Sequence, residues 1–298
     1  MCELDFRKQA IEADKKKYIK AAENGDAEAQ YQLSLLYSIY IESDDNHQHE
    51  IFWLRKAANQ GHVDAIMDLA DTYEYGLLVE KDLAEAAKLY RQAAELGNVD
   101  AQNCLSYFYF TGKGVDVDVS EGLKWCRMAA EQGAPEAEYN LAISYLNGYG
   151  VEINIPEAIK WFRLAGEHGN VNSQCILGDF YYYGTNVPQD YEEAAKWYKM
   201  ASAQQDAHAQ NMCGIMYECG IGVTENLRRA VKYYHKAAKK GLDAAQYNLG
   251  LCYQEGTWVD QDLRDALKWF KLAAEQGHEK AKQKVFEIEE LLQNNKTQ

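Results

Sequence analysis

Seven glycines recur at a spacing of 36 residues through nearly the whole chain. They are Gly25, Gly61, Gly97, Gly133, Gly169, Gly241 and Gly277, and Gln205 holds the remaining position. A fixed period of this length is typical of solenoids, whose units bury their apolar faces only by stacking on one another. The register has no insertion or deletion and defines seven repeats: 26–61, 62–97, 98–133, 134–169, 170–205, 206–241 and 242–277.

The first half of each repeat carries three columns of residues spaced four apart. The first column is Ala or Ser, the second is Leu or Cys, and the third is always tyrosine. The tyrosines are Tyr37, Tyr73, Tyr109, Tyr145, Tyr181, Tyr217 and Tyr253. Residues four apart share one face of a helix, so we predict a first helix that buries this stripe in the core.

A glycine turn and a second helix complete the repeat. In six repeats the turn begins at Gly76, Gly112, Gly148, Gly184, Gly220 or Gly256. An N-cap residue follows it, at Asp82, Asp118, Asn154, Asp190, Asn226 or Asp262. The second helix then buries small and aromatic residues, such as Ala158, Trp161 and Phe162 in repeat 4. Repeat 1 departs from the pattern, with Tyr40-Ile41-Glu42-Ser43 where the turn belongs.

The two ends of the chain read as half repeats with polar residues in core columns. Residues 6–23 match a lone second helix, and residues 279–293 match a lone first helix with Glu289 in the tyrosine column. Polar replacements of this kind are typical of solenoid caps. We therefore expect an N-terminal capping segment (1–25), seven repeats (26–277), and a C-terminal capping helix and tail (278–298). The fold class is all-α, a right-handed α/α superhelical solenoid of 16 helices.

The tandem motifs A-x-x-x-L-x-x-x-Y, G-x-G-V, A-x-x-W-[YF] and A-A-E-x-G together resemble the Sel-1-like repeat family, relatives of the tetratricopeptide repeats. The resemblance covers residues 6–293. It implies a non-enzymatic adaptor or scaffold that holds partners on the concave side of a superhelix. Some secreted bacterial members carry two cysteines per repeat, whereas the seven cysteines here recur at no fixed spacing.

Charge and composition narrow the class of partner. The net charge of −15 disfavours nucleic acid and anionic membranes, which require basic surfaces. No apolar run approaches the ~18 residues of a transmembrane helix, and the N-terminus lacks the apolar core of a signal peptide. The absence of a C-x-x-C pair argues against a zinc site or a disulfide ladder. We expect a cytoplasmic protein, monomeric alone, without metal, cofactor or small-molecule substrate.

Three features resemble chemical sites but have simpler interpretations. The G-x-G triplets lack the third glycine and the preceding strand of a dinucleotide site. His47 and His49 lie two apart, which does not place them on one helix face, and an atypical loop over residues 44–50 is the simpler interpretation. Cys175 and His208 share a face of adjacent first helices, without a third group to orient them.

The second helices carry a basic column: Lys88, Lys124, Lys160, Lys196, Lys232 and Lys268. Oppositely charged residues four apart predict ion pairs on a solvated outer face: Arg91–Glu95, Arg127–Glu131, Arg163–Glu167 and Lys271–Glu275.

Five columns of the first helix point away from the Ala/Leu/Tyr stripe. They hold nine acids and no lysine or arginine: Glu28, Asp64, Asp71, Glu74, Asp100, Glu136, Asp179, Glu218 and Glu255. Repeats 3 to 5 place large apolar residues there: Tyr107, Phe110, Tyr139, Ile143, Leu146, Tyr182 and Tyr183. Apolar residues rimmed by charge are typical of protein interaction sites. The predicted partner is a protein or peptide with basic residues and an apolar anchor. An alternative function is inhibition of a basic enzyme or toxin, and ordinary packing between repeats is the simpler structural interpretation.

Overall fold

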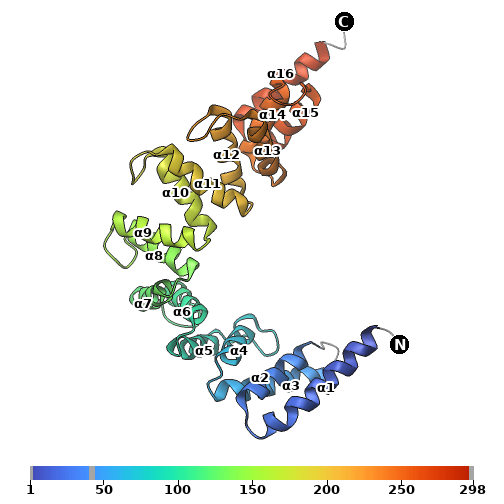
Figure 1. Cartoon of the computed structure of the whole chain (residues 1–298), viewed down its shortest axis with the longest axis vertical. Helices are drawn as coiled ribbons and strands as arrows, with labels where there is room; N and C mark the ends of the chain where they lie inside the picture. The colour runs from blue at the N-terminus through green and yellow to red at the C-terminus, as the bar shows by residue number, and fades with distance from the viewer. Residues whose placement is uncertain (1–2, 40–43, 295–298) are drawn as a thin grey trace. The chain divides into compact units, whose positions relative to one another are not determined.

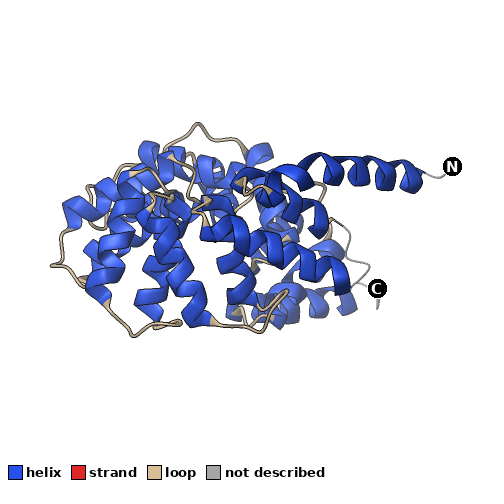
Figure 2. Cartoon of the chain, turned by 90° about the horizontal axis from the view of Figure 1, so that it is seen from below, coloured by secondary structure: helices blue, strands red, loops and turns tan. Residues whose placement is uncertain are grey.

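The computed structural model describes residues 3–39 and 44–294, with side chains described for 13–39 and 46–293. Within these ranges the chain forms 16 helices and no strand (Figure 2). The predicted all-α solenoid and its number of helices are confirmed. The unusual turn of repeat 1, Tyr40-Ile41-Glu42-Ser43, lies outside the described residues.

The helices follow the predicted order of one capping helix, seven hairpins and a second capping helix (Figure 1). Their bounds are α1 Glu3–Glu23, α2 Ala27–Ser38, α3 Asp44–Asn59, α4 Val63–Tyr75, α5 Leu83–Glu95, α6 Val99–Thr111, α7 Val119–Glu131, α8 Pro135–Asn147, α9 Ile155–Glu167, α10 Val171–Tyr183, α11 Tyr191–Ala203, α12 Ala207–Cys219, α13 Leu227–Lys239, α14 Asp243–Glu255, α15 Leu263–Glu275 and α16 Glu279–Asn294. The even-numbered helices α2 to α14 are the first helices of the repeats, and the odd-numbered helices α3 to α15 are the second helices.

The chain divides into two compact units, residues 1–153 and 154–298. Unit 1 contains α1 to α8, and unit 2 contains α9 to α16. In each unit a helix packs chiefly against the helix before it and the helix after it. This one-dimensional stacking is the arrangement expected of a repeat array.

The turns form as the sequence predicts. Gly112 ends α6 in the left-handed conformation with φ 71°, and its N–H donates to the carbonyl of Phe108. Glycine adopts this conformation without the steric cost that a side chain imposes. Asp118 then caps α7 by accepting from the N–H of Glu121 at 3.0 Å. All six predicted glycine ends and all six predicted N-caps of this kind are present.

Besides the Ala/Leu/Tyr stripe of the first helix, one position of the second helix lies at the centre of the core. Tyr90, Phe162, Tyr198, Tyr234 and Phe270 hold this position and are fully buried. The tyrosine column of the first helix lies nearer the surface: Tyr109, Tyr181 and Tyr217 are buried, and the others are half-buried.

The outer-face arginines make different contacts from the predicted ones. Instead of pairing with the acid four residues on, Arg91, Arg127 and Arg163 donate to the column tyrosine of the next repeat, and Arg55 makes the same contact. These pairs are Arg55–Tyr73, Arg91–Tyr109, Arg127–Tyr145 and Arg163–Tyr181. The guanidinium also lies over the tyrosine ring, so a cation–π interaction adds to the hydrogen bond. The prediction from helix spacing is therefore wrong for Arg91, Arg127 and Arg163, and Lys271 likewise pairs with Glu289 of the cap.

In repeats 2 to 5 the lysine of the basic column pairs with the acid three residues before it. The pairs are Glu85–Lys88, Glu121–Lys124, Glu157–Lys160 and Glu193–Lys196, with N–O distances of 2.8 to 3.2 Å. The outer face of repeats 2 to 5 is thus neutralised locally.

Candidate functional site

The first-helix face comprises the five columns of α2, α4, α6, α8, α10, α12 and α14 that point away from the core stripe. In unit 1, Asp64, Asp100 and Glu136 share one of these columns on three consecutive first helices, and all three are exposed. No lysine or arginine among the described residues forms an ion pair with them. They therefore give this part of unit 1 an uncompensated negative charge.

The predicted apolar residues of unit 1 differ in their access to solvent. Tyr107 is 54% exposed. Phe110 is half-buried, with its ring against Gly122 and its centroid 5.5 Å from that of Tyr149. Tyr139, Ile143 and Leu146 are also half-buried. Tyr107 is thus the residue of this set best placed to contact a partner.

Asp71 and Glu74 contact a buried phenol within their own repeat. The hydroxyl of Tyr90 lies 2.5 Å from Asp71 Oδ1 and 2.7 Å from Glu74 Oε2. Burial raises the pKa of Tyr90 above its ordinary value, and the two carboxylates raise it further. Glu74 is itself buried, and Lys113 Nζ lies 2.6 Å from its other oxygen. These two acids satisfy a buried hydroxyl, which would otherwise be costly.

The same pairing occurs in unit 2. Tyr198 donates to Asp179 at 2.5 Å, and Tyr234 donates to Glu218 at 2.5 Å. Where the second helix has phenylalanine instead, as in repeats 4 and 7, the facing residues of the first helix are uncharged. These are Ile143 and Leu146 in repeat 4, and Leu251 and Gln254 in repeat 7. The acid therefore accompanies the buried hydroxyl, so this part of the acidic pattern has a structural cause.

Asp179 also contacts a histidine. Its Oδ1 lies 3.0 Å from His208 Nε2, and this hydrogen bond is the main cause that raises the pKa of His208 above its ordinary value. The thiol of Cys175 has a raised pKa because of burial and the charge of Asp206, so its reactive thiolate form is disfavoured. The geometry thus orients His208 toward Asp179 and provides no activated nucleophile at Cys175.

Tyr182 and Tyr183 end α10 in unit 2. Tyr182 is half-buried, with its ring centroid 5.5 Å from that of Tyr191 and 6.3 Å from that of Tyr198. Tyr183 is 59% exposed. Of the two predicted anchors, Tyr183 is therefore the more accessible.

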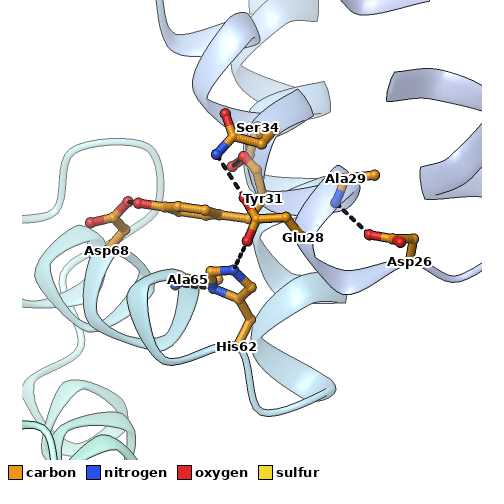
Figure 3. A network of polar contacts seen from close by, with 9 residues as sticks. Asp26, Glu28, Ala29, Tyr31, Ser34, His62, Ala65 and Asp68 are labelled. Carbon is orange, nitrogen blue, oxygen red and sulfur yellow. Dashed lines mark hydrogen bonds and ion pairs between the residues drawn. The ribbon is translucent and has the colours of Figure 1, made fainter. Parts of the chain in front are cut away.

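A polar network on α2 and α4 includes a residue that the sequence pattern missed (Figure 3). The hydroxyl of Tyr31 donates to Asp68 Oδ2 at 2.9 Å, across the boundary between repeats 1 and 2. His62 caps α4 by accepting from Ala65, and its Nε2 lies 2.9 Å from Glu28 Oε2. Burial raises the pKa of Asp68. Asp68 stands one residue before the leucine column, where no other repeat has an acid.

The histidine-rich segment of repeat 1 is helical, which corrects the expectation of a loop. Residues 44–50 form the first two turns of α3. The ring of His49 stacks on Tyr37, with centroids 5.0 Å apart. No group of three or more His, Cys, Asp or Glu side chains suited to a metal occurs in the described part of the chain.

Two further findings concern helices and thiols. Among the described residues, no helix is both long and apolar enough to cross a membrane. The six described cysteines are free thiols: Cys104, Cys126, Cys175, Cys213, Cys219 and Cys252.

Comparison with known proteins agrees with the fold. The sequence model of the Sel1 repeat matches seven times, over residues 27–62, 63–98, 99–133, 135–170, 171–206, 207–242 and 243–278. The chain belongs to the Sel1 repeat family. All seven matched ranges begin one residue after the repeats that the glycines define. Sel1 repeats generally form scaffolds for protein interaction. No curated protein sequence matches the chain significantly.

Two solved structures are similar over most of the chain. One is c5321, described as a protective antigen of uropathogenic Escherichia coli with an SLR fold; it is 32% identical, with a TM-score of 0.86. That match covers 91% of this Sel1 repeat chain but only 58% of c5321. The other is a Sel1 repeat protein from Oxalobacter formigenes, 30% identical with a TM-score of 0.68, which covers 91% of this chain and 78% of that one.

Proposed function

We propose that this chain is a protein-binding scaffold whose first-helix face receives a basic segment of a partner, anchored by an apolar residue. The observation that carries the proposal is the contrast between the two faces of unit 1. Acids on the outer face have a lysine three residues away, whereas Asp64, Asp100 and Glu136 have no such cation. Exposed charge of one sign without internal compensation favours association with the opposite charge.

The proposed site assigns different roles to its residues. In unit 1, the exposed ring of Tyr107 serves as an apolar anchor, and Asp64, Asp100 and Glu136 attract the basic residues. Asp71 and Glu74 are held by Tyr90 and mainly fix the local structure. In unit 2, Tyr183 with Tyr182 and Asp179 forms a second candidate contact of the same character. Non-catalytic binding is consistent with the raised pKa of Cys175.

The test uses a partner recovered from native lysate with the full chain and identified by mass spectrometry. Its association rate is then measured against two variants. The first carries Asp64→Asn, Asp100→Asn and Glu136→Gln. The matched control carries Glu85→Gln and Glu121→Gln on the outer face of α5 and α7. Its third change is Asp116→Asn, at an exposed acid in the turn before α7.

We expect the first variant to associate about tenfold more slowly at low salt and to lose most of its salt dependence. The control, which loses the same formal charge, should change much less. Equal effects of the two variants would mean that only net charge matters, and the proposed face would be wrong. If the partner is an enzyme, its activity with and without the chain distinguishes scaffold from inhibitor.

A further inference from the structure

Helix α13 of repeat 6 differs in charge from the rest of this acidic chain. Its sequence, LRRAVKYYHKAAK, contains five lysines or arginines and no acid. The chain as a whole carries a net charge of −15. The outer face of repeat 6 is therefore locally basic.

Three positions of α13 depart from the pattern of the other repeats. Arg229 stands where repeats 2 to 5 have glutamate and repeat 7 has aspartate. Tyr233 stands where five of the other six repeats have tryptophan. His235 stands where every other repeat has arginine or lysine. All three residues line the same pocket.

The pocket has a volume of about 590 Å³ and lies wholly within unit 2. Aromatic rings from three helices, Tyr217, Tyr233 and Tyr253, form part of its wall. The rings of Tyr217 and Tyr233 stack with centroids 5.7 Å apart and an interplanar angle of 8°. Volumes of this size are typical of small-molecule sites.

The exchange of arginine for histidine leaves the space beside Tyr253 open. In repeats 1 to 4 the equivalent arginine extends to the tyrosine of the next repeat, as Arg127 does to Tyr145 at 3.0 Å. The shorter His235 instead lies edge-on to Trp269, with centroids 6.2 Å apart. The volume that a guanidinium fills elsewhere is thus part of the pocket.

The cations of the pocket lack the acidic partners found in other repeats. Lys196 pairs with Glu193 at 2.9 Å, but the residue three before Lys232 is Arg229. Arg229 donates to the hydroxyl of Tyr217 at 3.2 Å. Within the described residues, no ion pair joins Arg229, Lys232 or Lys236 to a carboxylate. Burial and the charge of Lys239 lower the pKa of His235, so it contributes a neutral ring at pH 7.

We propose that this pocket binds a small organic anion with a flat apolar body, such as an aryl phosphate or aryl carboxylate. The apolar body lies against Tyr233 and Tyr253, in the space that an arginine fills in other repeats. The anionic group lies at the rim, where Arg229, Lys232 and Lys236 supply charge without a competing acid. The site is distinct from the first-helix face and uses the opposite charge.

The test is calorimetric titration of the full chain with phenyl phosphate. Inorganic phosphate lacks the ring, benzyl alcohol lacks the charge, and benzyltrimethylammonium carries the opposite charge. We expect saturable binding of phenyl phosphate, at least about tenfold tighter than binding of any of the three. Absence of saturation in the millimolar range, or tighter binding of the cation, would overturn the proposal.

Two variants place the binding in this pocket. His235→Arg restores the residue of repeats 1 to 4 and should fill the space beside Tyr253. Lys232→Ala removes an unpaired cation, and Lys196→Ala is its matched control in repeat 5. We expect the first two to weaken phenyl phosphate binding at least about tenfold and the control to leave it unchanged. Unchanged binding in His235→Arg, with the variant folded by circular dichroism, would show that the ligand binds elsewhere and that the inference is wrong.

Discussion

The hydroxyl of Tyr198, in the middle of α11, donates to the carboxylate of Asp179 on α10 at 2.5 Å. Tyr198 is fully buried, and Asp179 is half-buried in the same hairpin. One carboxylate therefore satisfies a core hydroxyl from one side and remains accessible to solvent from the other. An acid that holds its repeat together can therefore also face a partner, as proposed for Asp179.

Tyr198→Phe should lower the free energy of unfolding by about 1–2 kcal/mol, because the variant leaves Asp179 without its phenol donor. Combining it with Asp179→Leu recreates the phenylalanine–leucine pair of Phe270 and Leu251 and should recover much of the loss. Urea unfolding followed by circular dichroism measures both. A double variant no more stable than Tyr198→Phe would show that the two residues are not energetically coupled.

Tyr107→Ala and Tyr109→Ala separate the face from the core within one helix. Tyr107 is 54% exposed, so its truncation should cost less than about 1 kcal/mol of stability. Tyr109 is 8% exposed and receives the Arg91 hydrogen bond, so its truncation should cost about 3–5 kcal/mol. Thermal unfolding distinguishes the two. The Tyr107→Ala variant should also dissociate faster from the partner. Similar losses of stability in the two variants would place Tyr107 in the core.

His208 and His235 should titrate on opposite sides of the ordinary histidine pKa of 6.5. The hydrogen bond to Asp179 raises the pKa of His208, and burial lowers that of His235. The His208–Asp179 contact therefore stabilises the fold at pH values below 6.5, and this contribution is lost as pH rises through the higher folded pKa. His208 is nearly half exposed, so the contribution is small. NMR titration of the imidazole resonances gives both values, and Asp179→Asn should lower that of His208 alone.

Cys219 should be the first of the six described thiols to react with iodoacetamide at pH 8. It is exposed, whereas burial raises the pKa of Cys126 and Cys252 to about 12 and that of Cys213 to about 11. Cys175, with its pKa also raised, should react slowly and support no hydrolysis of model esters. Peptide mapping by mass spectrometry reports each site. Fast labelling of Cys175, or esterase activity lost in Cys175→Ala, would contradict the structure.

Local chemistry made much of the fold predictable from the sequence. Gly112 and Asp118 act through their own backbone and the next turn, so residue type and spacing suffice to place them. Contacts between repeats were harder to predict. Helix spacing paired Arg91 with Glu95, but the phenol of Tyr109 in the next repeat offers the guanidinium both an acceptor and a ring face.

The candidate site shows the same limit. The exposure of Asp64 and Asp100 follows from helix geometry alone. The burial of Glu74 depends on Tyr90 and Lys113, which lie 16 and 39 residues away. The repeat columns did not indicate Asp68, because its partner Tyr31 lies 37 residues before it, in a different column.

The tyrosine–acid pairs close within single repeats, whereas the arginine–tyrosine pairs join neighbours. A gene duplication that copies one 36-residue unit therefore carries both members of a pair such as Tyr90 and Asp71, and no buried hydroxyl loses its acceptor. The arginine at the new junction meets a tyrosine in any case, because every repeat supplies one in that column. These two kinds of contact survive a gain or loss of whole units in evolution, whereas a contact between particular neighbours, such as that of Glu74 with Lys113, does not.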